Sequence, residues 1–401
     1  MCLNRMIKSA SKILDQMKFY QIIKLTGLFL IFIISACSID DYSPLRDPEA
    51  KTDIEYTWSA TADSMQNATY TTYLSSNGTF KQDNQGNEFF NYWWNAHMVH
   101  VLIDGYNRTA DNVYISRAKA LVEGIYTRNG NHFPNEFNDD MAWLAIACTR
   151  AYEASGDNYF LDVSKLLWSE IIKSWSDLYD GGITWKTNTP LSKNAVSNAP
   201  VAILSMRLYQ LDGGEDYFDW AKKIYDWQKN TLVDPASGLV WDNINTVDGD
   251  VVVNKDWIFT YNIGTYIGAS LELYNETKDA TYLNEALKTA TSMMTSSKLT
   301  TEGMLRDEGQ GDGGLFKGIL IRYFTTLILH RDINEANRKS FQDFFQFNAE
   351  TFYEKGLERP SMLSNSNWKT SPGDRVDFST QLSGVMLVEA AALLHEEGLL
   401  K

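Results

Sequence analysis

The amino-acid sequence predicts an all-α protein, an (α/α)6 barrel of two concentric rings of six helices. The first observation is a repeat: an apolar helix, a polar turn and an amphipathic helix recur every 45–65 residues or so, a period within the range of helical repeat arrays (roughly 20–50 residues and slightly above). The second is a difference within each pair. The first helix is more apolar and richer in small residues, whereas the second carries Lys and Glu. First helices therefore belong inside and second helices outside. An open α-solenoid is the structural alternative.

The expected helices follow one another in pairs along the chain. Five pairs are expected at residues 90–105 and 111–125, 140–154 and 158–175, 199–211 and 215–227, 262–274 and 278–294, and 314–330 and 335–349. A last helix, residues 379–396, is expected to pair with one at residues 58–74 and so to close the ring. Strand signals are few, and the best of them, Val251–Val253, is expected in a loop.

The first 36 residues are expected to be a lipoprotein signal peptide, with Met17 as an alternative start. Lys18 and Lys24 precede an apolar run, residues 25–34, which is too short for an ordinary membrane span. The run leads into Ile34-Ser35-Ala36-Cys37, which resembles a lipoprotein signal-peptidase site. Cys37 is therefore expected to become the lipidated N-terminus.

Residues 37–55 are expected to form a flexible tether, followed by one helical domain over residues 56–401. The chain lacks an Asp directly after Cys37 and so resembles lipoproteins sent to the outer membrane of Gram-negative bacteria. Asp40 and Asp41 resemble a surface-export signal, which predicts a cell-surface location. Contact with the membrane is expected through the N-terminal lipid only.

Composition narrows the classes of partner. The chain has 401 residues, a formal net charge of -15 and a pI near 4.8, which argues against nucleic acid and polyanionic substrates but not against neutral polymers. The 12 Trp and 21 Tyr exceed the usual needs of a core, and aromatic rings stack on sugar faces, although most are expected to pack inside.

Cys2 leaves with the signal peptide and Cys37 takes lipid, so Cys148 has no disulfide partner in the mature chain. The protein is expected to be a monomer.

Two neighbouring carboxylates, Asp139 and Asp140, are the strongest candidates for chemistry, because they stand where a loop meets a helical stretch. Hydrolysis of a glycosidic bond needs two carboxyl groups in different protonation states a few ångströms apart. The N–H groups at a helix start favour an ionised carboxylate, whose charge then raises the pKa of its neighbour. The structural alternative is that Asn138 caps the helix and that acidic residues are simply favoured in a first turn.

Polar residues also stand at or near the starts of the other expected inner helices. They are His97, Asn198, Tyr261 with Asn262, Asp312 with Gly313 and Gly314, and Thr380 with Gln381. If the rings close, these starts gather at one end of the barrel. We therefore expect a ligand site at that end.

Three stretches resemble glycoside hydrolase family 76, the endo-α-1,6-mannanases. They are Asn138-Asp139-Asp140-Met141-Ala142-Trp143, residues 259–269 from Phe259 through Tyr261-Asn262 to Ala269, and residues 307–319 with Asp312-Gly313-Gly314. The resemblance runs from about Trp58 to Leu394. One departure is Ile263, at a position where Gln is common in the family, which leaves one polar contact with the sugar in doubt.

The resemblance implies an (α/α)6 barrel that cleaves α-1,6-mannosidic links of yeast- or fungal-type α-mannan with retention of configuration. It assigns Asp139 as the nucleophile and Asp140 as the general acid and then base. It implies manno-oligosaccharide or mannan partners and no cofactor. Retention requires the two carboxyl groups about 5–5.5 Å apart, whereas inversion requires about 6.5–9.5 Å.

Six further residues are candidates for sugar binding: Asn138, Tyr261, Asn262, Asp312, Trp94 and Trp143. Tyr261 and Asn262 are expected to hydrogen-bond sugar hydroxyls, with a core ring and an N-cap as their structural alternatives. Asp312 precedes a glycine pair that permits close approach of the backbone to a ligand, or it is a turn residue. His97 and His100 share a helix face, but nothing nearby completes a metal-ligand set, so no metal is expected.

Two other functions remain open from the residues alone. One is a non-catalytic, glycan-binding surface lipoprotein, which needs the aromatic residues and the tether but not the aspartate pair. The other is a different (α/α)6 enzyme, such as an inverting glycosidase or a sugar epimerase. Epimerases of this shape use histidines near the barrel mouth, and the chain has only 5 histidines to supply them.

Overall fold

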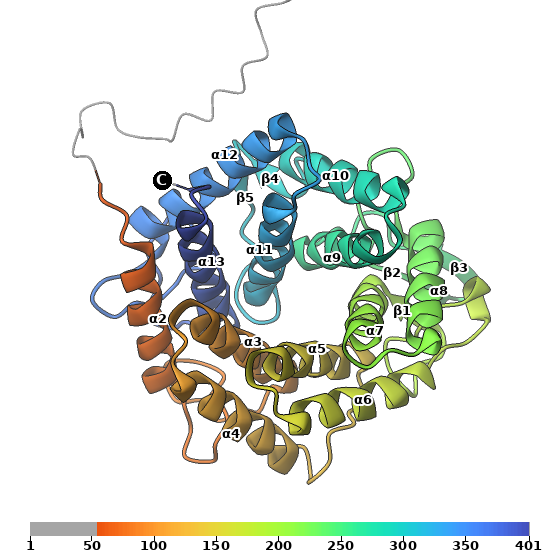
Figure 1. Cartoon of the computed structure of the whole chain (residues 1–401), viewed down its shortest axis with the longest axis horizontal. Coiled ribbons are helices and arrows are strands. Elements are labelled where there is room, and N and C mark those ends of the chain that lie inside the picture. The colour runs from red at the N-terminus through yellow and green to blue at the C-terminus, as the bar shows by residue number, and fades with distance from the viewer. Residues whose placement is uncertain (1–53, 401) are drawn as a thin grey trace, which may run out of the picture. The chain divides into compact units, whose positions relative to one another are not determined.

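The computed structural model describes residues 54–400, and twelve α-helices alternate along them between an inner and an outer ring (Figure 1). The inner helices are α3 (Tyr92–Thr109), α5 (Asn138–Ser155), α7 (Ala199–Asp212), α9 (Thr260–Thr277), α11 (Gly313–Leu329) and α13 (Phe378–Glu396). The outer helices are α2 (Trp58–Tyr73), α4 (Asn112–Arg128), α6 (Asn158–Ile172), α8 (Glu215–Leu232), α10 (Ala280–Thr295) and α12 (Glu335–Thr351).

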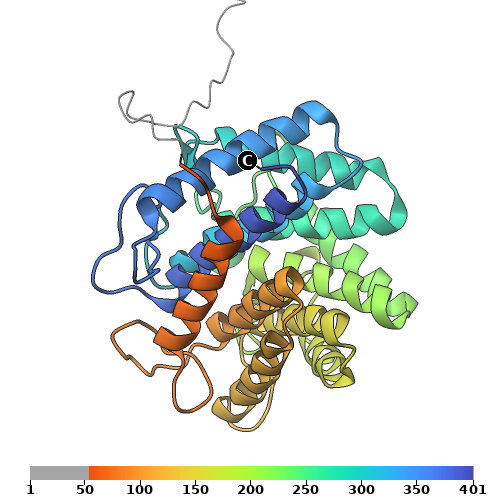
Figure 2. The ribbon, with the colours of Figure 1, turned by 60° about the vertical axis from the view of Figure 1, so that its left-hand side comes forward.

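The inner ring is closed. Each inner helix packs against the next one along the chain, and α13 packs against both α11 and α3. The last inner helix also packs against α2, the first described helix, and the two lie side by side in both views (Figure 2). The predicted (α/α)6 barrel is therefore confirmed, and the open solenoid is wrong.

A short turn joins inner to outer helices in three of the pairs. Helices α3, α5 and α9 each end in a left-handed residue, namely Ala110, Gly156 and Lys278. The next residue is an aspartate, Asp111, Asp157 or Asp279, whose carboxylate accepts a hydrogen bond from an N–H of the outer helix that it caps. In these three pairs, the polar turn seen in the sequence is therefore the aspartate that caps the outer helix.

The inner helices approach one another closely at glycines. A Cβ placed on Gly264 of α9 would lie 2.6 Å from the Cα of Leu320 in α11, and one on Gly268 would lie 2.4 Å from the ring of Tyr323. These distances are far below ordinary van der Waals contact, so α9 and α11 can pack this closely only because the glycines lack side chains. The small residues predicted to face inward do so.

The five strands found within residues 54–400 all lie in connections that lead from an outer helix to the next inner helix. Strands β1 (Ser192–Asn194), β2 (Asn243–Val247) and β3 (Asp250–Val253) form one antiparallel sheet, and β4 (Thr300–Thr301) pairs with β5 (Met304–Leu305). Short helical turns occur at Leu178–Asp180, Ala195–Ser197 and, continuing α12, Phe352–Gly356. The predicted strand at Val251–Val253 is confirmed within β3.

The expected helices are present with shifted ends. The largest shift is at the end of α8, which ends at Leu232 and not at Trp227, whereas α6 ends early, at Ile172 and not at Trp175. The N–H of Trp175 bonds to the carbonyl of Ile172 in a tight turn, and Trp175 then pairs with Ile183.

The predicted signal peptide (residues 1–36) and the lipidated Cys37 lie outside the described residues, as does most of the predicted tether. Across residues 54–400, no helix combines the length and the apolar character needed to cross a membrane.

Candidate active site

A cleft opens at the end of the barrel where the inner helices begin. Its volume is about 910 Å³, towards the upper end of the roughly 300–1,000 Å³ of small-molecule sites. Its aromatic lining is Phe89, Phe90, Tyr92, Trp93, Phe137, Trp143, Trp185, Tyr261 and Phe316, and its acidic lining is Glu136, Asp139, Asp140 and Asp312. Aromatic faces beside carboxylates suit a sugar ring, which stacks on one and hydrogen-bonds to the other.

Asp139 and Asp140 lie in the first turn of α5 and line this cleft. The N–H groups of that turn and the side chain of Trp185 lower the pKa of the Asp139 carboxyl, whose Oδ1 is buried without a hydrogen-bond partner within the described residues. The Oδ2 of Asp140 accepts a hydrogen bond from the Nδ2 of Asn135 at 3.0 Å. The two neighbours therefore have different surroundings, because the N–H groups of the helix start act on the pKa of Asp139 and the side chain of Asn135 bonds to Asp140.

The two carboxyl groups also differ in acidity. Burial raises the pKa of Asp139 to about 7, although the N–H groups of the turn and Trp185 oppose the rise. Burial raises the pKa of Asp140 well above its usual range, and the charges of Asp139 and Asp312 add to the rise. Asp139 therefore loses its proton first. The N–H groups of the helix start lower the pKa of Asp139, as predicted, but burial raises it by more. Both carboxyl groups therefore have a pKa above the ordinary range.

Asn138 is not the helix cap that the structural alternative required. The capping position is Phe137, and no side chain caps α5. Asn138 is fully buried, and its Nδ2 donates to the carbonyl oxygen of Thr184 at 2.8 Å. It does not line the cleft, so the predicted contact with sugar does not fit its position. Instead it ties the start of α5 to the loop that carries Trp185.

Tyr261 and Asn262 at the start of α9 share one acceptor. The ring of Tyr261 lines the cleft and is stacked on Phe316, with 3.9 Å between centroids. Its Oη donates to Oδ1 of Asp242 at 3.2 Å, and Nδ2 of Asn262 donates to the same oxygen at 2.9 Å. Asn262 is fully buried behind the cleft, so its predicted bond to a sugar hydroxyl does not fit either.

Asp312 lines the cleft and is oriented by two indoles. Its Oδ1 accepts hydrogen bonds from Nε1 of Trp93 at 3.2 Å and from Nε1 of Trp94 at 3.1 Å. Trp94 is buried and does not line the cleft, so its predicted contact with the sugar does not fit its position. It holds Asp312 instead. Trp143 does line the cleft, and its ring lies 4.8 Å from that of His97 between centroids.

The other polar residues predicted near helix starts are buried within the protein and do not line the cleft. Asn198 is buried and bonds to both the N–H and the carbonyl of Ile183. Gln381 is buried and bonds to Thr69 and to the backbone at Ser364. Thr380 and His97 are also buried and do not line the cleft. Three of the six helix starts therefore bring the predicted Asp139–Asp140, Tyr261 and Asp312 to one cleft.

Several residues of the site were missed from the sequence. Trp185 and Asn135 belong to loops without a recognisable motif. Asp242 lies just before β2, and the only available signal was a lone acidic residue between Trp241 and Asn243. Burial raises the pKa of Asp242, although its three hydrogen-bond donors oppose the rise.

Solved structures similar to this chain have the same fold over most of their length. The α-1,6-mannanase GH76A of Salegentibacter sp. HEL1_6 is 56% identical with a TM-score of 0.83, covering 84% of this chain and 99% of that chain. One of its structures is of an inactive variant with two consecutive aspartates replaced by asparagine, in complex with α-1,6-mannotriose. The Lin0763 protein of Listeria innocua is 37% identical with a TM-score of 0.79, covering 85% of this chain and 99% of that chain.

Curated relatives in yeasts are more distant. The putative mannan endo-1,6-alpha-mannosidase of Schizosaccharomyces pombe is 25% identical over 288 residues, 66% of this chain and 64% of that protein. The mannan endo-1,6-alpha-mannosidase DCW1 of Candida glabrata is 27% identical over 205 residues, 46% of each chain. These matches span 46% to 64% of the relatives' own length. A sequence profile of glycosyl hydrolase family 76 matches residues 57–401, and the chain belongs to that family.

Proposed function

We propose that this protein is an endo-acting glycoside hydrolase that cleaves α-1,6-mannosidic linkages in the backbone of yeast- or fungal-type α-mannan. The observation that carries the proposal is the carboxylate pair at the cleft. Asp139–Asp140 is the only pair of consecutive aspartates in residues 57–401. Replacement of two consecutive aspartates gives an inactive variant of the Salegentibacter mannanase, which is 56% identical. That correspondence supports Asp139 and Asp140 as the reacting groups.

The proposed reaction is a double displacement with retention of configuration. Asp140, which keeps its proton to higher pH, donates it to the glycosidic oxygen while the carboxylate of Asp139 attacks the anomeric carbon. The bond to the departing mannan chain breaks, and a mannosyl ester of Asp139 forms. Water then loses a proton to Asp140 and attacks the anomeric carbon. The ester breaks, which frees a mannan chain whose new end is a mannose unit. Asp139 is again ionised and Asp140 again protonated.

Other cleft residues bind and orient the sugar in this proposal. The stacked pair Tyr261 and Phe316, together with Trp143 and Trp185, offers flat apolar faces. Asp312, held by two indoles, offers a carboxylate oxygen to a sugar hydroxyl. A neutral substrate agrees with the acidic cleft and with the net charge of -15, because neither favours an anion.

The test is incubation of the purified protein with linear α-1,6-mannan, with product release as the readout. We expect oligosaccharide release that is lost in both Asp139→Asn and Asp140→Asn, by at least a thousandfold. Asp343→Asn is the matched control, because Asp343 pairs with Lys339 on the outer helix α12. Detection of the product anomer by NMR tests retention separately, and initial release of the β-anomer would refute it. Binding of mannan without turnover would refute the enzyme and leave the glycan-binding lipoprotein as the function.

We also propose that Cys37 carries lipid and that the protein faces outward from the outer membrane of a Gram-negative bacterium. The support is the sequence alone: the apolar run, the Ser35-Ala36-Cys37 site and the acidic residues that follow. In cells that express the full chain, Cys37→Ala is expected to move the protein from the membrane to the soluble fraction. Protease treatment of intact cells tests the outward orientation, and complete protection would contradict it.

A further inference from the structure

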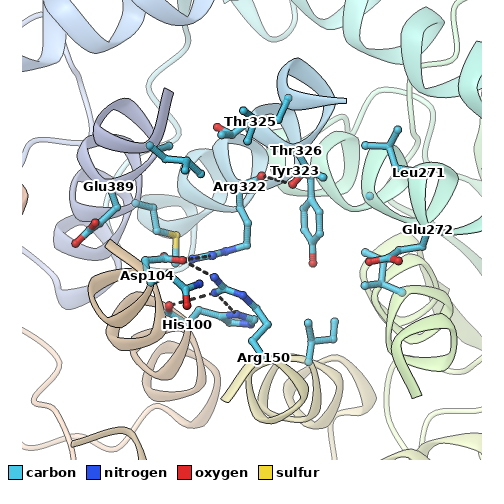
Figure 3. Close-up of a pocket in the computed structure, with 18 of the residues that line it drawn as sticks. His100, Asp104, Arg150, Leu271, Glu272, Arg322, Tyr323, Thr325, Thr326 and Glu389 are labelled. Carbon is cyan, nitrogen blue, oxygen red and sulfur yellow. Dashed lines mark hydrogen bonds and ion pairs between the residues drawn. The ribbon is translucent and has the colours of Figure 1, made fainter. Parts of the chain in front are cut away.

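A second cavity lies at the opposite end of the barrel, where the inner helices end (Figure 3). We call it the basal pocket, and its volume is about 250 Å³. Every one of the six inner helices contributes at least one charged side chain to its wall, in chain order Asp104, Arg150, Arg207, Glu272, Arg322 and Glu389, and α3 and α13 each add a second, Arg108 and Glu396. None of these residues lines the catalytic cleft.

The charges around the basal pocket cancel. Asp104 pairs with Arg150 at 2.6 Å and with Arg322 at 2.7 Å, and Glu272 lies 3.5 Å from Arg207. Glu389 pairs with Arg108 at 2.8 Å, and Glu396 completes the acidic lining, so four arginines face four carboxylates. His100 is neutral, because burial lowers its pKa well below the usual range. The pocket therefore has no net charge to attract an ion.

Some polar atoms of the pocket remain without a protein partner. Thr325 is 4% exposed, and its Oγ1 makes no hydrogen bond within the described residues. The same holds for Nε of Arg322. The ring of Tyr323 packs against Gly268, and Figure 3 shows its phenol reaching into the space that the charged ring encloses. A buried hydroxyl or N–H without a partner costs about 1–3 kcal/mol, so a ligand that pairs with these atoms would gain binding energy from them.

We propose that the basal pocket is a second binding site, for a neutral polyhydroxylated ligand of one or two sugar rings. Guanidinium donors stand beside carboxylate acceptors around the pocket. Two neighbouring hydroxyls of a sugar can accept from the first and donate to the second. An anion would meet Glu272 and Glu389, and a cation would meet the arginines. The volume is just below the roughly 300–1,000 Å³ of small-molecule sites, which suits a short oligosaccharide.

The identity of this ligand as a manno-oligosaccharide rests on the proposed function. A substrate with many identical units can occupy both sites, and a site remote from the cleft would hold the polymer or a released product against the enzyme. The competing explanation is that the charged ring is only a clamp on the six inner helices. The two explanations differ in what happens when the hydroxyls of Tyr323 and Thr325 are removed, because the ion pairs of a clamp do not include them.

The test is calorimetric titration of α-1,6-mannotriose into the Asp139→Asn/Asp140→Asn variant, which prevents turnover. We expect two molecules bound per chain, and one after addition of Tyr323→Phe and Thr325→Val. Thr325→Ser keeps the hydroxyl and is expected to keep both sites. Tyr282→Phe with Thr351→Val makes the same chemical changes on outer helices and is the matched control. Because the Oγ1 of Thr325 has no partner within the described residues and neither hydroxyl takes part in the ion pairs, the melting temperature should be unchanged.

One bound molecule in the parent variant would overturn the second site, as would two bound molecules after removal of both hydroxyls. Binding of inorganic phosphate in competition with the sugar at the basal pocket would also overturn it. Failure of the proposed function is distinguishable, because turnover by the unmutated protein is measured separately. Turnover with a single bound sugar refutes only the second site, and two bound sugars without turnover refute only the hydrolase.

Discussion

The phenol of Tyr261 and the carboxylate of Asp242 are joined by a hydrogen bond of 3.2 Å from Oη to Oδ1. Nδ2 of Asn262 donates to the same oxygen, and Nδ2 of Asn243 donates to the other one. A single buried carboxylate therefore positions the start of α9 and the aromatic wall of the cleft. Its charge also raises the pKa of Asp139. Asp242 thus acts on the reaction through position and through charge.

Asp242→Asn is expected to move the acidic limb of the pH profile of kcat/KM to lower pH, because loss of a negative charge lowers the pKa of Asp139. The value of kcat is expected to fall by roughly tenfold to a hundredfold, since an amide cannot accept all three donors and Tyr261 shifts. Tyr261→Phe is the control, because it removes one donor and keeps the charge. An acidic limb that stays in place or moves to higher pH would contradict the prediction.

The pH profile itself tests the assignment of roles. The nucleophile must be ionised, so activity is expected to rise with pH through about 7 as Asp139 loses its proton. The acid must be protonated, so activity falls only at the higher pH where Asp140 ionises. Because Asp139 and Asp140 interact, the two limbs of the profile give apparent pKa values of the pair and not of either residue alone. Asn135→Ala removes a bond that stabilises ionised Asp140 and is expected to move the basic limb to higher pH.

Trp94→Phe tests the support of Asp312. The change keeps a buried ring but removes a hydrogen bond of 3.1 Å to the carboxylate. A bond of this kind contributes about 1 kcal/mol, so KM is expected to rise roughly fivefold with little change in kcat. Trp175→Phe is the matched control, because the Nε1 of Trp175 is buried without a partner. A fall in kcat with unchanged KM would place Asp312 in the chemical step and contradict a binding role.

Gly264→Ala tests the close packing of the inner ring. The new methyl group would lie 2.6 Å from the Cα of Leu320, and backbone cannot move aside as a flexible side chain can. Overpacking of this kind is expected to lower the free energy of unfolding by about 1–3 kcal/mol, measured by urea denaturation. Gly373→Ala meets nothing within 4 Å and is expected to leave the stability unchanged. Equal stabilities of the two variants would contradict the packing argument.

The fold was predictable because its signals are local. A pair of helices shows its period, its polar turn and its capping aspartate within a few dozen residues, and the barrel repeats that unit. The ends of helices were less predictable, as the early end of α6 shows, because the turn that follows the helix is held by the pairing of Trp175 with Ile183, for which the sequence has no periodic signal. Closure of the ring was inferred from an unpaired last helix, and it depends on the contacts of α13 with α3 and α2, near the other end of the described chain.

The sequence alone determined the helical barrel, the position of Asp139 and Asp140 at an inner helix start, and the approach of Tyr261 and Asp312 to the same end. Only the tertiary structure decided which polar residues reach the cleft. Asn138, Asn262 and Trp94 stand beside cleft residues in the chain but point into the protein, because successive residues of a helix face different directions. The contacts of Asp242 with Tyr261 and Asn262 join the loop before β2 to the start of α9, and the charged ring of the basal pocket joins helices far apart in sequence. The burial of these groups, and the pKa shifts that burial causes, exist only once the chain has folded.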